Sequence, residues 1–133
     1  MSQPATITVE IAPGELIDKI TILKIKADRI TNAAKLENVH CELATLEAAR
    51  DQALTSSAKL DELTSQLLSI NERLWDIEDH IRDCEREKDF GERFVELARS
   101  VYKSNDRRAA LKREINELLG SRLLEEKSYS DYD

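Results

Sequence analysis

Two oppositely charged stretches in the second half of the chain hold the residues best suited to chemistry. From Glu72 to Glu92 there are nine acidic and four basic residues, whereas Arg99 to Arg113 contains six basic residues and one acidic residue. Asn71 and Glu78 lie beside an apolar stripe at helical spacing, so we expect both side chains to be partly buried. A buried carboxylate needs a charged or hydrogen-bonding partner, and the basic stretch can supply one.

We predict that these stretches form an acid–base layer between two antiparallel helices. Counting equal distances from the intervening turn places Glu78 near Arg99 to Lys103, and Asn71 near Arg107. The favoured interpretation is a buried ion-pair network that fixes the helix register. The alternative is a site for a small anionic ligand or a partner carboxylate. The candidate residues are Asn71, Glu78, Asp79, Arg82, Arg99, Arg107 and Arg108.

Secondary candidates lie near the N-terminus, at Glu15, Asp18 and Lys19. Glu15-x-x-Asp18 places two carboxylates on one helix face, as Asp76-x-x-Asp79 does, and helical metal-dependent phosphohydrolases use such pairs. Matching of the helix dipole or a solvated face explains these pairs equally well in a chain this acidic. We therefore expect no metal site and no cofactor.

The histidines and cysteines indicate no catalytic arrangement. His40 and His80 fall off the apolar stripes, and neither has neighbours that would make a nucleophile. Cys41 and Cys84 have no disulfide-framework or metal-ligand spacing, and Cys84 falls on an apolar seam. A reducing cytoplasm is the expected compartment, and a non-enzyme is favoured over an enzyme.

A long helix must position the acidic stretch. Apolar residues recur at alternating spacings of three and four, which is a heptad seam of more than three heptads. The break at 55–57 precedes this helix, which is expected to run to about Lys88. The seam residues are Leu60, Leu63, Leu67, Ile70, Leu74, Ile77, Ile81 and Cys84.

The basic stretch belongs to a further helix, the fourth of the chain. We expect Asp89 to cap it, with Glu92 as the partner in a capping box, and Gly120 to end it. The connection to the preceding helix is short, so the two helices must be antiparallel. Ser104 and Arg108 interrupt the apolar seam of this helix, which predicts either a kink near Asn105 or a buried polar layer.

The first half of the chain is expected to hold an extended segment and two helices. Alternating apolar residues over 6–11 indicate a strand, which must pair with a second copy or lie as an arm on the helices. Residues 13–30 are apolar on two sides, which favours a helix that is central or also at a subunit interface. Its β-branched run over 20–25 leaves a strand as the less favoured alternative. Asn32 is a candidate N-cap for a thinly apolar, peripheral helix over 33–54.

Composition supports one all-α domain over residues 1–133, a bundle of about four helices with long antiparallel third and fourth helices. The chain has only 3 glycines and 2 prolines, whereas an all-β fold needs many turn residues. A net charge of −7 argues against nucleic-acid binding, and no apolar run approaches the length of a membrane span. Residues 1–12 are expected to be an extended arm or strand, and 121–133 a partly ordered tail.

Three stretches together resemble a bacterial family of small uncharacterised proteins. They are PGELIDKITILKIKADRI at 13–30, LWDIEDHIRDCE at 74–85, and DFGERFVELARSVYKSNDRRAALKREINELLGS at 89–121 with EEKSY at 125–129. The resemblance covers most of the chain, and its first motif is distinctive. It implies a free-standing bacterial cytoplasmic domain, and it implies no catalytic residues.

Two hypotheses for function follow from these patterns. The first is a helical interaction or scaffold protein, expected to be a homodimer or to bind a protein partner, because of the doubly apolar helix, the possible pairing strand and the long seams. The second is a small-ligand-binding or enzymatic helical domain that uses Glu78 and the basic layer, with Glu15, Asp18 and Lys19 nearby.

Overall fold

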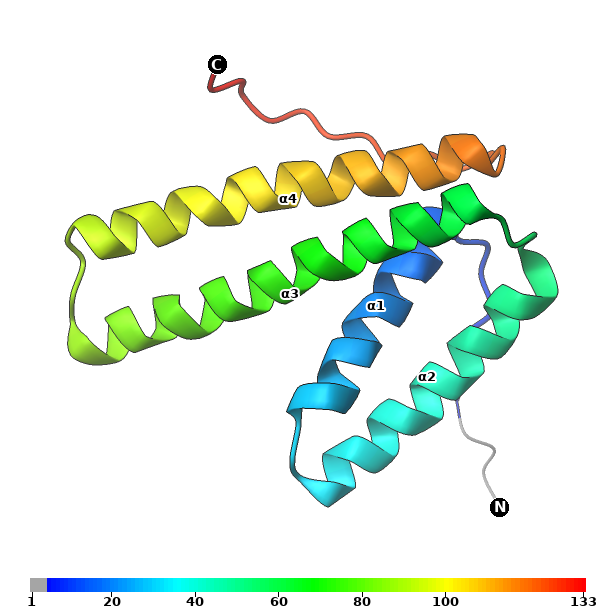
Figure 1. Ribbon diagram of the computed structural model, residues 1–133, viewed down its shortest axis with the longest axis horizontal. Helices are drawn as coiled ribbons and strands as arrows, with labels where there is room; N and C mark the ends of the chain where they lie inside the picture. Colours follow the sequence, from blue (N-terminus) through cyan, green and yellow to red (C-terminus); the bar gives the residue numbers. More distant parts are fainter. Residues whose placement is uncertain (1–4) are drawn as a thin grey trace.

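The computed structural model describes residues 5–133 and folds them into four helices (Figure 1). These are α1 (Pro13–Arg29), α2 (Ala33–Ala53), α3 (Ala58–Glu87) and α4 (Glu92–Leu118). Within this described part there is no strand, so the prediction of an all-α bundle is confirmed. The helices form two antiparallel hairpins, and the α3–α4 hairpin is the longer one (Figure 1).

Local capping signals fix most of the helix ends. Asn32 Oδ1 accepts a hydrogen bond from the backbone N–H of Lys35 at 2.9 Å, and Ser57 Oγ caps α3 in the same way. Gly120, with φ of +65°, follows the end of α4 as the expected left-handed residue.

The predicted capping box at the start of α4 is wrong. Lys88 takes the left-handed conformation and ends α3, so Asp89 falls inside the turn. Its Oδ1 accepts from the N–H of Gly91 at 3.1 Å, and Gly91 is the N-cap without a side-chain bond to the helix. Glu92 is then the first helical residue, too early to complete a capping box.

α1 is the central helix of the fold. It packs against α2, α3 and α4, whereas α2 packs against α1 and against no other helix in the described chain. Ile17 contributes to a core with Leu63, Leu67, Leu111 and Ile115, all almost fully buried. Contact with three helices explains why α1 is apolar on two sides and helical despite its β-branched residues.

α1 covers only part of the α3–α4 hairpin. The end of the hairpin around the α3–α4 turn projects beyond α1 and α2 (Figure 1). We call residues 77–103 the arm; Glu78, Asp79 and Arg82 at its base still border a cavity with Ile22 and Ile25 of α1. Cys84 remains fully buried between the two helices of the arm. The arm also has partly exposed apolar residues, namely Ile81, Phe94 and Leu97. They continue the same apolar seams whose residues are buried beside α1. The arm is therefore a two-helix element without a covering layer.

The described terminal segments, residues 5–12 and 119–133, are non-helical. Residues 5–12 are extended but form no strand, and Ile7, Val9 and Ile11 are exposed, so the strand predicted at 6–11 is absent within one chain. Residues 1–4 of the predicted arm or strand lie outside the described residues. The tail after Gly120 runs back beside α4, where the hydroxyl of Tyr132 donates to Asp106 Oδ2 at 2.7 Å (Figure 1).

Candidate functional site

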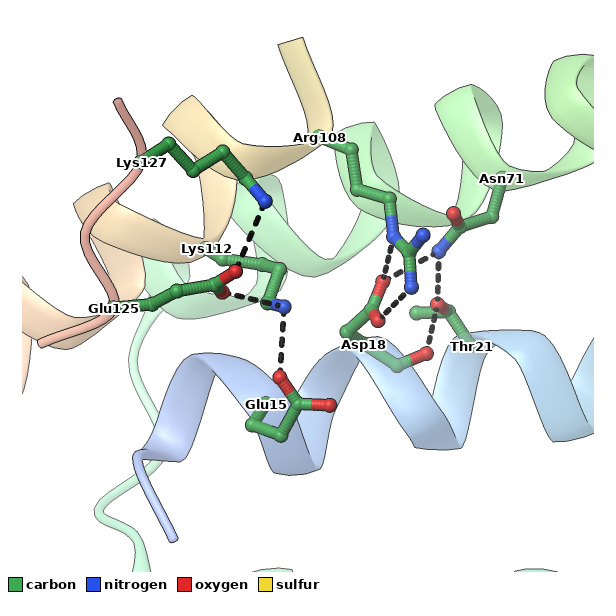
Figure 2. Close-up of polar contacts among 8 residues, drawn as sticks. All are labelled: Glu15, Asp18, Thr21, Asn71, Arg108, Lys112, Glu125 and Lys127. Carbon is green, nitrogen blue, oxygen red and sulfur yellow. Dashed lines mark hydrogen bonds and ion pairs between the residues drawn. The ribbon is translucent and has the colours of Figure 1, made fainter. Parts of the chain in front are cut away.

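A buried polar cluster lies where α1 crosses α3 and α4 (Figure 2). Asp18 of α1 is only 1% exposed, and its carboxylate accepts from Nε and Nη2 of Arg108 on α4. Asn71 Nδ2 of α3 donates to Asp18 Oδ1 and to Thr21 Oγ1, both at 2.9 Å. Thr21 Oγ1 in turn donates to the carbonyl of Asp18 at 2.7 Å. We call these four residues the Asp18 cluster.

The local sequence explains how each helix supplies its part of this cluster. Asp18 and Thr21 are three residues apart and share one face of α1. Ser104, which is buried, and Arg108 are the two residues that interrupt the apolar seam of α4. Because α4 is one continuous helix from Glu92 to Leu118, the interruption is a buried polar layer and not a break in the helix.

The electrostatics of the cluster favour the charged form of Arg108. The hydrogen bonds from Arg108 to Asp18 raise the pKa of the guanidinium above its usual value, and this effect outweighs burial, which lowers it. Two parallel N–H···O bonds give the bidentate geometry in which an arginine–carboxylate pair is strongest. A pair this well bonded defines the angle at which α1 crosses the hairpin.

A second polar group, the Lys112 bridge, joins α1, α4 and the tail (Figure 2). Lys112 Nζ lies 2.7 Å from Glu15 Oε2 and 3.1 Å from Glu125 Oε2, and Lys127 Nζ lies 3.0 Å from Glu125 Oε1. Burial lowers the pKa of Lys112, but its hydrogen bonds to Glu15 and Glu125 outweigh this and raise it. The tail is thus attached to α4 by charge.

Acid should release the tail from α4. Hydrogen bonds from Lys127 and Lys112 lower the pKa of Glu125, so its ion pairs stabilise the docked tail above the pKa in the free chain, about 4.3. This stabilisation is lost as the pH falls through the lower pKa of the docked state. We expect the ring signals of Tyr132 in NMR spectra to move to free-chain positions in this range. Glu125→Gln should show them largely released at pH 7, and a docked tail in that variant would contradict the expectation.

The predicted acid–base layer between α3 and α4 is wrong in its pairings. Glu78 is exposed and pairs with Arg82 of its own helix. Arg99 pairs with Glu96, also one turn away on the same helix. The space between α3 and α4 is filled by their apolar seams, so charged residues beside the seams turn outward. The buried carboxylate comes from α1. The prediction had counted distances from the α3–α4 turn only and so did not consider α1.

Three further predicted residues lie on the surface. Arg107 donates to Gln66 at 2.8 Å and not to Asn71. Asp79 is exposed, and Lys19 lies 3.8 Å from Glu42 of α2.

Of the predicted residues, Asn71, Arg108 and Asp18 meet in the cluster. Sequence analysis missed Thr21 and three residues of the Lys112 bridge, namely Lys112, Glu125 and Lys127. Thr21 could have been found, because it shares with Asp18 a face of a helix that is apolar on its other sides.

Two cavities flank the Asp18 cluster. Five of the predicted residues line the first, which has a volume of about 550 Å³ and which we call the Trp75 crevice; they are Asn71, Glu78, Asp79, Arg82 and Arg108. The second, of about 590 Å³, lies between α4 and the tail and is bordered by all three tyrosines of the chain. Arg108 lines both cavities.

The described residues include no group of three or more potential metal-ligand side chains. None of the four helices is both long and apolar enough to cross a membrane.

Fold and site together define an all-α protein in which two helical hairpins cross over a buried Asp–Arg cluster. The chain belongs to a family of unknown function (DUF6165), whose model matches residues 7–132. This agrees with the expected membership of a domain-of-unknown-function family. Comparison with curated proteins and with solved structures gave no match.

Proposed function

We propose that the protein is a homodimeric interaction module and that two copies pair through their arms. The observation that carries this proposal is the uncovered arm, a two-helix element that shares its seams with the core but lacks the third layer that α1 provides elsewhere. A domain buries its apolar faces between packed layers, so such an element is completed by a partner. A second arm packed antiparallel would make a four-helix bundle with two-fold symmetry.

The apolar surface of the arm supports this pairing. Phe90 and Val95 at its tip are about half exposed, at 52% and 50%. Phe90 stacks edge-on against Phe94, with ring centroids 5.4 Å apart, so the tip presents a rigid aromatic pair. Val101, nearer the base, is also partly exposed. These residues are exposed in a single chain, so their burial in a dimer would stabilise the dimer through the hydrophobic effect.

Charge complementarity favours a second copy as the partner. Among the described residues, no ion pair joins the acidic residues 72–85 of α3 to the basic residues 99–113 of α4. They pair within their own helices, with α1 or with the tail. In an antiparallel overlap of two arms, the acidic α3 of one copy lies against the basic α4 of the other. Opposite potentials of this kind select the partner and its orientation.

Charge reversal tests this proposal. Glu85 lies near the tip on α3 and Lys103 near the base on α4, so overlapping arms bring them close. Both are exposed and neither forms an ion pair in the described chain. We expect Glu85→Lys or Lys103→Glu to weaken the dimer about tenfold in sedimentation equilibrium, and the double variant to recover most of the loss.

The matched control for Lys103→Glu is Lys35→Glu on α2, which makes the same charge change away from the arm and should leave the dimer intact. A wild-type protein that remains monomeric at about 100 µM would overturn the proposal, because a useful homodimer must form below that concentration. Equal weakening by Lys35→Glu would do the same, since it would assign the effect to net charge.

The alternative, a site for a small anionic ligand between α3 and α4, is the weaker proposal. Arg108 is already neutralised by Asp18, and Arg82 by Glu78. Asp79 adds a negative charge to the rim of the Trp75 crevice. An anion there would have to displace an internal carboxylate, which makes tight binding unfavourable.

A further inference from the structure

Two residues that line the Trp75 crevice each have a polar atom that the fold leaves without a partner. Asn71 uses its Nδ2 for Asp18 and Thr21, which fixes the orientation of its amide, and Oδ1 accepts no hydrogen bond from the described residues. Arg108 uses Nε and Nη2 for Asp18, and Nη1 donates none. Figure 2 shows this third nitrogen turned toward Asn71 and away from Asp18.

Neither atom is fully buried. Every side-chain nitrogen or oxygen that is fully buried in the described chain has a hydrogen-bond partner. Asn71 Oδ1 and Arg108 Nη1 have none, so they are not fully buried, although Asn71 as a whole is only 5% exposed. Asn71 and Arg108 both line this crevice. An acceptor and a donor without partners therefore belong to two residues that line the same open cavity.

The walls of the crevice include apolar side chains and an aromatic ring that lies beside a cation. Ile22 of α1 and Leu74 and Trp75 of α3 contribute the walls. The guanidinium of Arg29 lies 6.0 Å from the centre of the Trp75 ring, and Arg29 is held in turn by Asp76. A concave apolar space with a few convergent polar groups is the usual form of a small-molecule site.

The charges around the crevice select against an anion. Arg108 is paired with Asp18, Arg82 is paired with Glu78, and Asp79 on the rim has no ion-pair partner in the described chain. The balance of these five residues is −1. A ligand should then be uncharged, with an acceptor for Arg108 Nη1 and a donor for Asn71 Oδ1. A carboxamide offers both groups side by side.

We propose that the Trp75 crevice binds small neutral molecules that carry a carboxamide on an apolar ring. The carboxamide oxygen accepts from Arg108 Nη1, its N–H donates to Asn71 Oδ1, and the ring packs against Trp75 and Ile22. This proposal does not rest on pairing of the arms, although Glu78, Asp79 and Arg82 of the crevice belong to the base of the arm.

Benzamide is the test ligand, and Trp75 is the reporter because it is the only tryptophan in the chain. We expect benzamide to shift the indole N–H signal of Trp75 saturably, with a Kd of about 1 mM, as is usual for a ligand of this size. Benzoate has the same shape with a negative charge, and it should bind about tenfold or more weakly. The titration is run on the wild type and on Lys103→Glu, so failure of arm pairing does not affect the result.

A filling variant localises the site. Ile22 is only partly buried, so Ile22→Phe should fold while occupying the crevice and weakening benzamide binding about tenfold. Leu43→Phe, at a partly exposed position on α2 outside the crevice, is the control and should bind as the wild type does. No shift of the Trp75 signal at about 20 mM benzamide, equal binding of benzoate, or unchanged binding by Ile22→Phe would each overturn the proposal.

Discussion

Asp18→Asn should destabilise the protein by about 3 kcal/mol, the largest loss we expect from a near-isosteric change in this chain. The substitution preserves the shape of the side chain but removes the negative charge that faces Arg108. Breaking a buried pair costs about 3–5 kcal/mol because the other charge stays behind without compensation. The side chain of Arg108 is 29% exposed, so we place the loss at the lower end of that range. The free energy of unfolding in urea measures it, with the denaturant slope as the check on two-state behaviour.

A double-mutant cycle separates loss of the pair from loss of packing. Asp18→Leu and Arg108→Met should each destabilise, but the double variant removes both charges and should recover much of the single losses. The surface control is Asp76→Asn, which removes the partner of Arg29 at an exposed site and should cost only a small fraction of the Asp18→Asn effect. Strictly additive losses in the cycle would show that the Asp18–Arg108 contact does not act as a unit.

Gly14→Ala should destabilise the protein by about 3 kcal/mol or more, although alanine is a better helix former than glycine. A Cβ atom on Gly14 would lie 2.5 Å from the backbone oxygen of Lys112 and 2.8 Å from Asn116 Oδ1. Backbone cannot rotate away as a flexible side chain can, so α1 must move off α4. That movement would also break the buried bond from the Gly14 N–H to Asn116 Oδ1, which is 2.7 Å long.

Gly91→Ala is the matched control for Gly14→Ala. The nearest atom to a Cβ at Gly91 is Asp89 Oδ1 at 3.4 Å, an ordinary contact with a side chain on the surface. We expect a change within about 0.5 kcal/mol, measured by the same urea titration. A Gly14→Ala protein as stable as Gly91→Ala would mean that α1 and α4 do not approach as closely as the fold requires.

The helices of this protein could be predicted from the sequence because their signals are local. The seam from Leu60 to Cys84 repeats within a few residues, and Asn32, Ser57 and Gly120 act on backbone groups in the adjacent turn. Even here one local rule failed. Asp89 is of a residue type that commonly caps helices, but the left-handed Lys88 ends α3 and leaves Asp89 in the turn.

The candidate site could be predicted only in part. Asn71 was correctly expected to be buried, because its position beside the seam is a property of one helix. Glu78 was expected to be buried on the same argument and is not. The difference is the third helix: Asp18 and Thr21 of α1 bond directly to Asn71, whereas Glu78 borders the open Trp75 crevice. The apolar pattern of α3 alone cannot predict where α1 crosses it.

By itself, then, the sequence determined four helices, their approximate ends and the antiparallel order of α3 and α4. Only the tertiary structure decided that Arg108 pairs with Asp18, 90 residues away in the chain, instead of with the acidic stretch on the neighbouring helix. It also decided that Gly14 must lack a side chain and that the arm has no covering layer. The physical reason is that helix formation depends on neighbours within four residues, whereas burial of a charge depends on how separate helices cross.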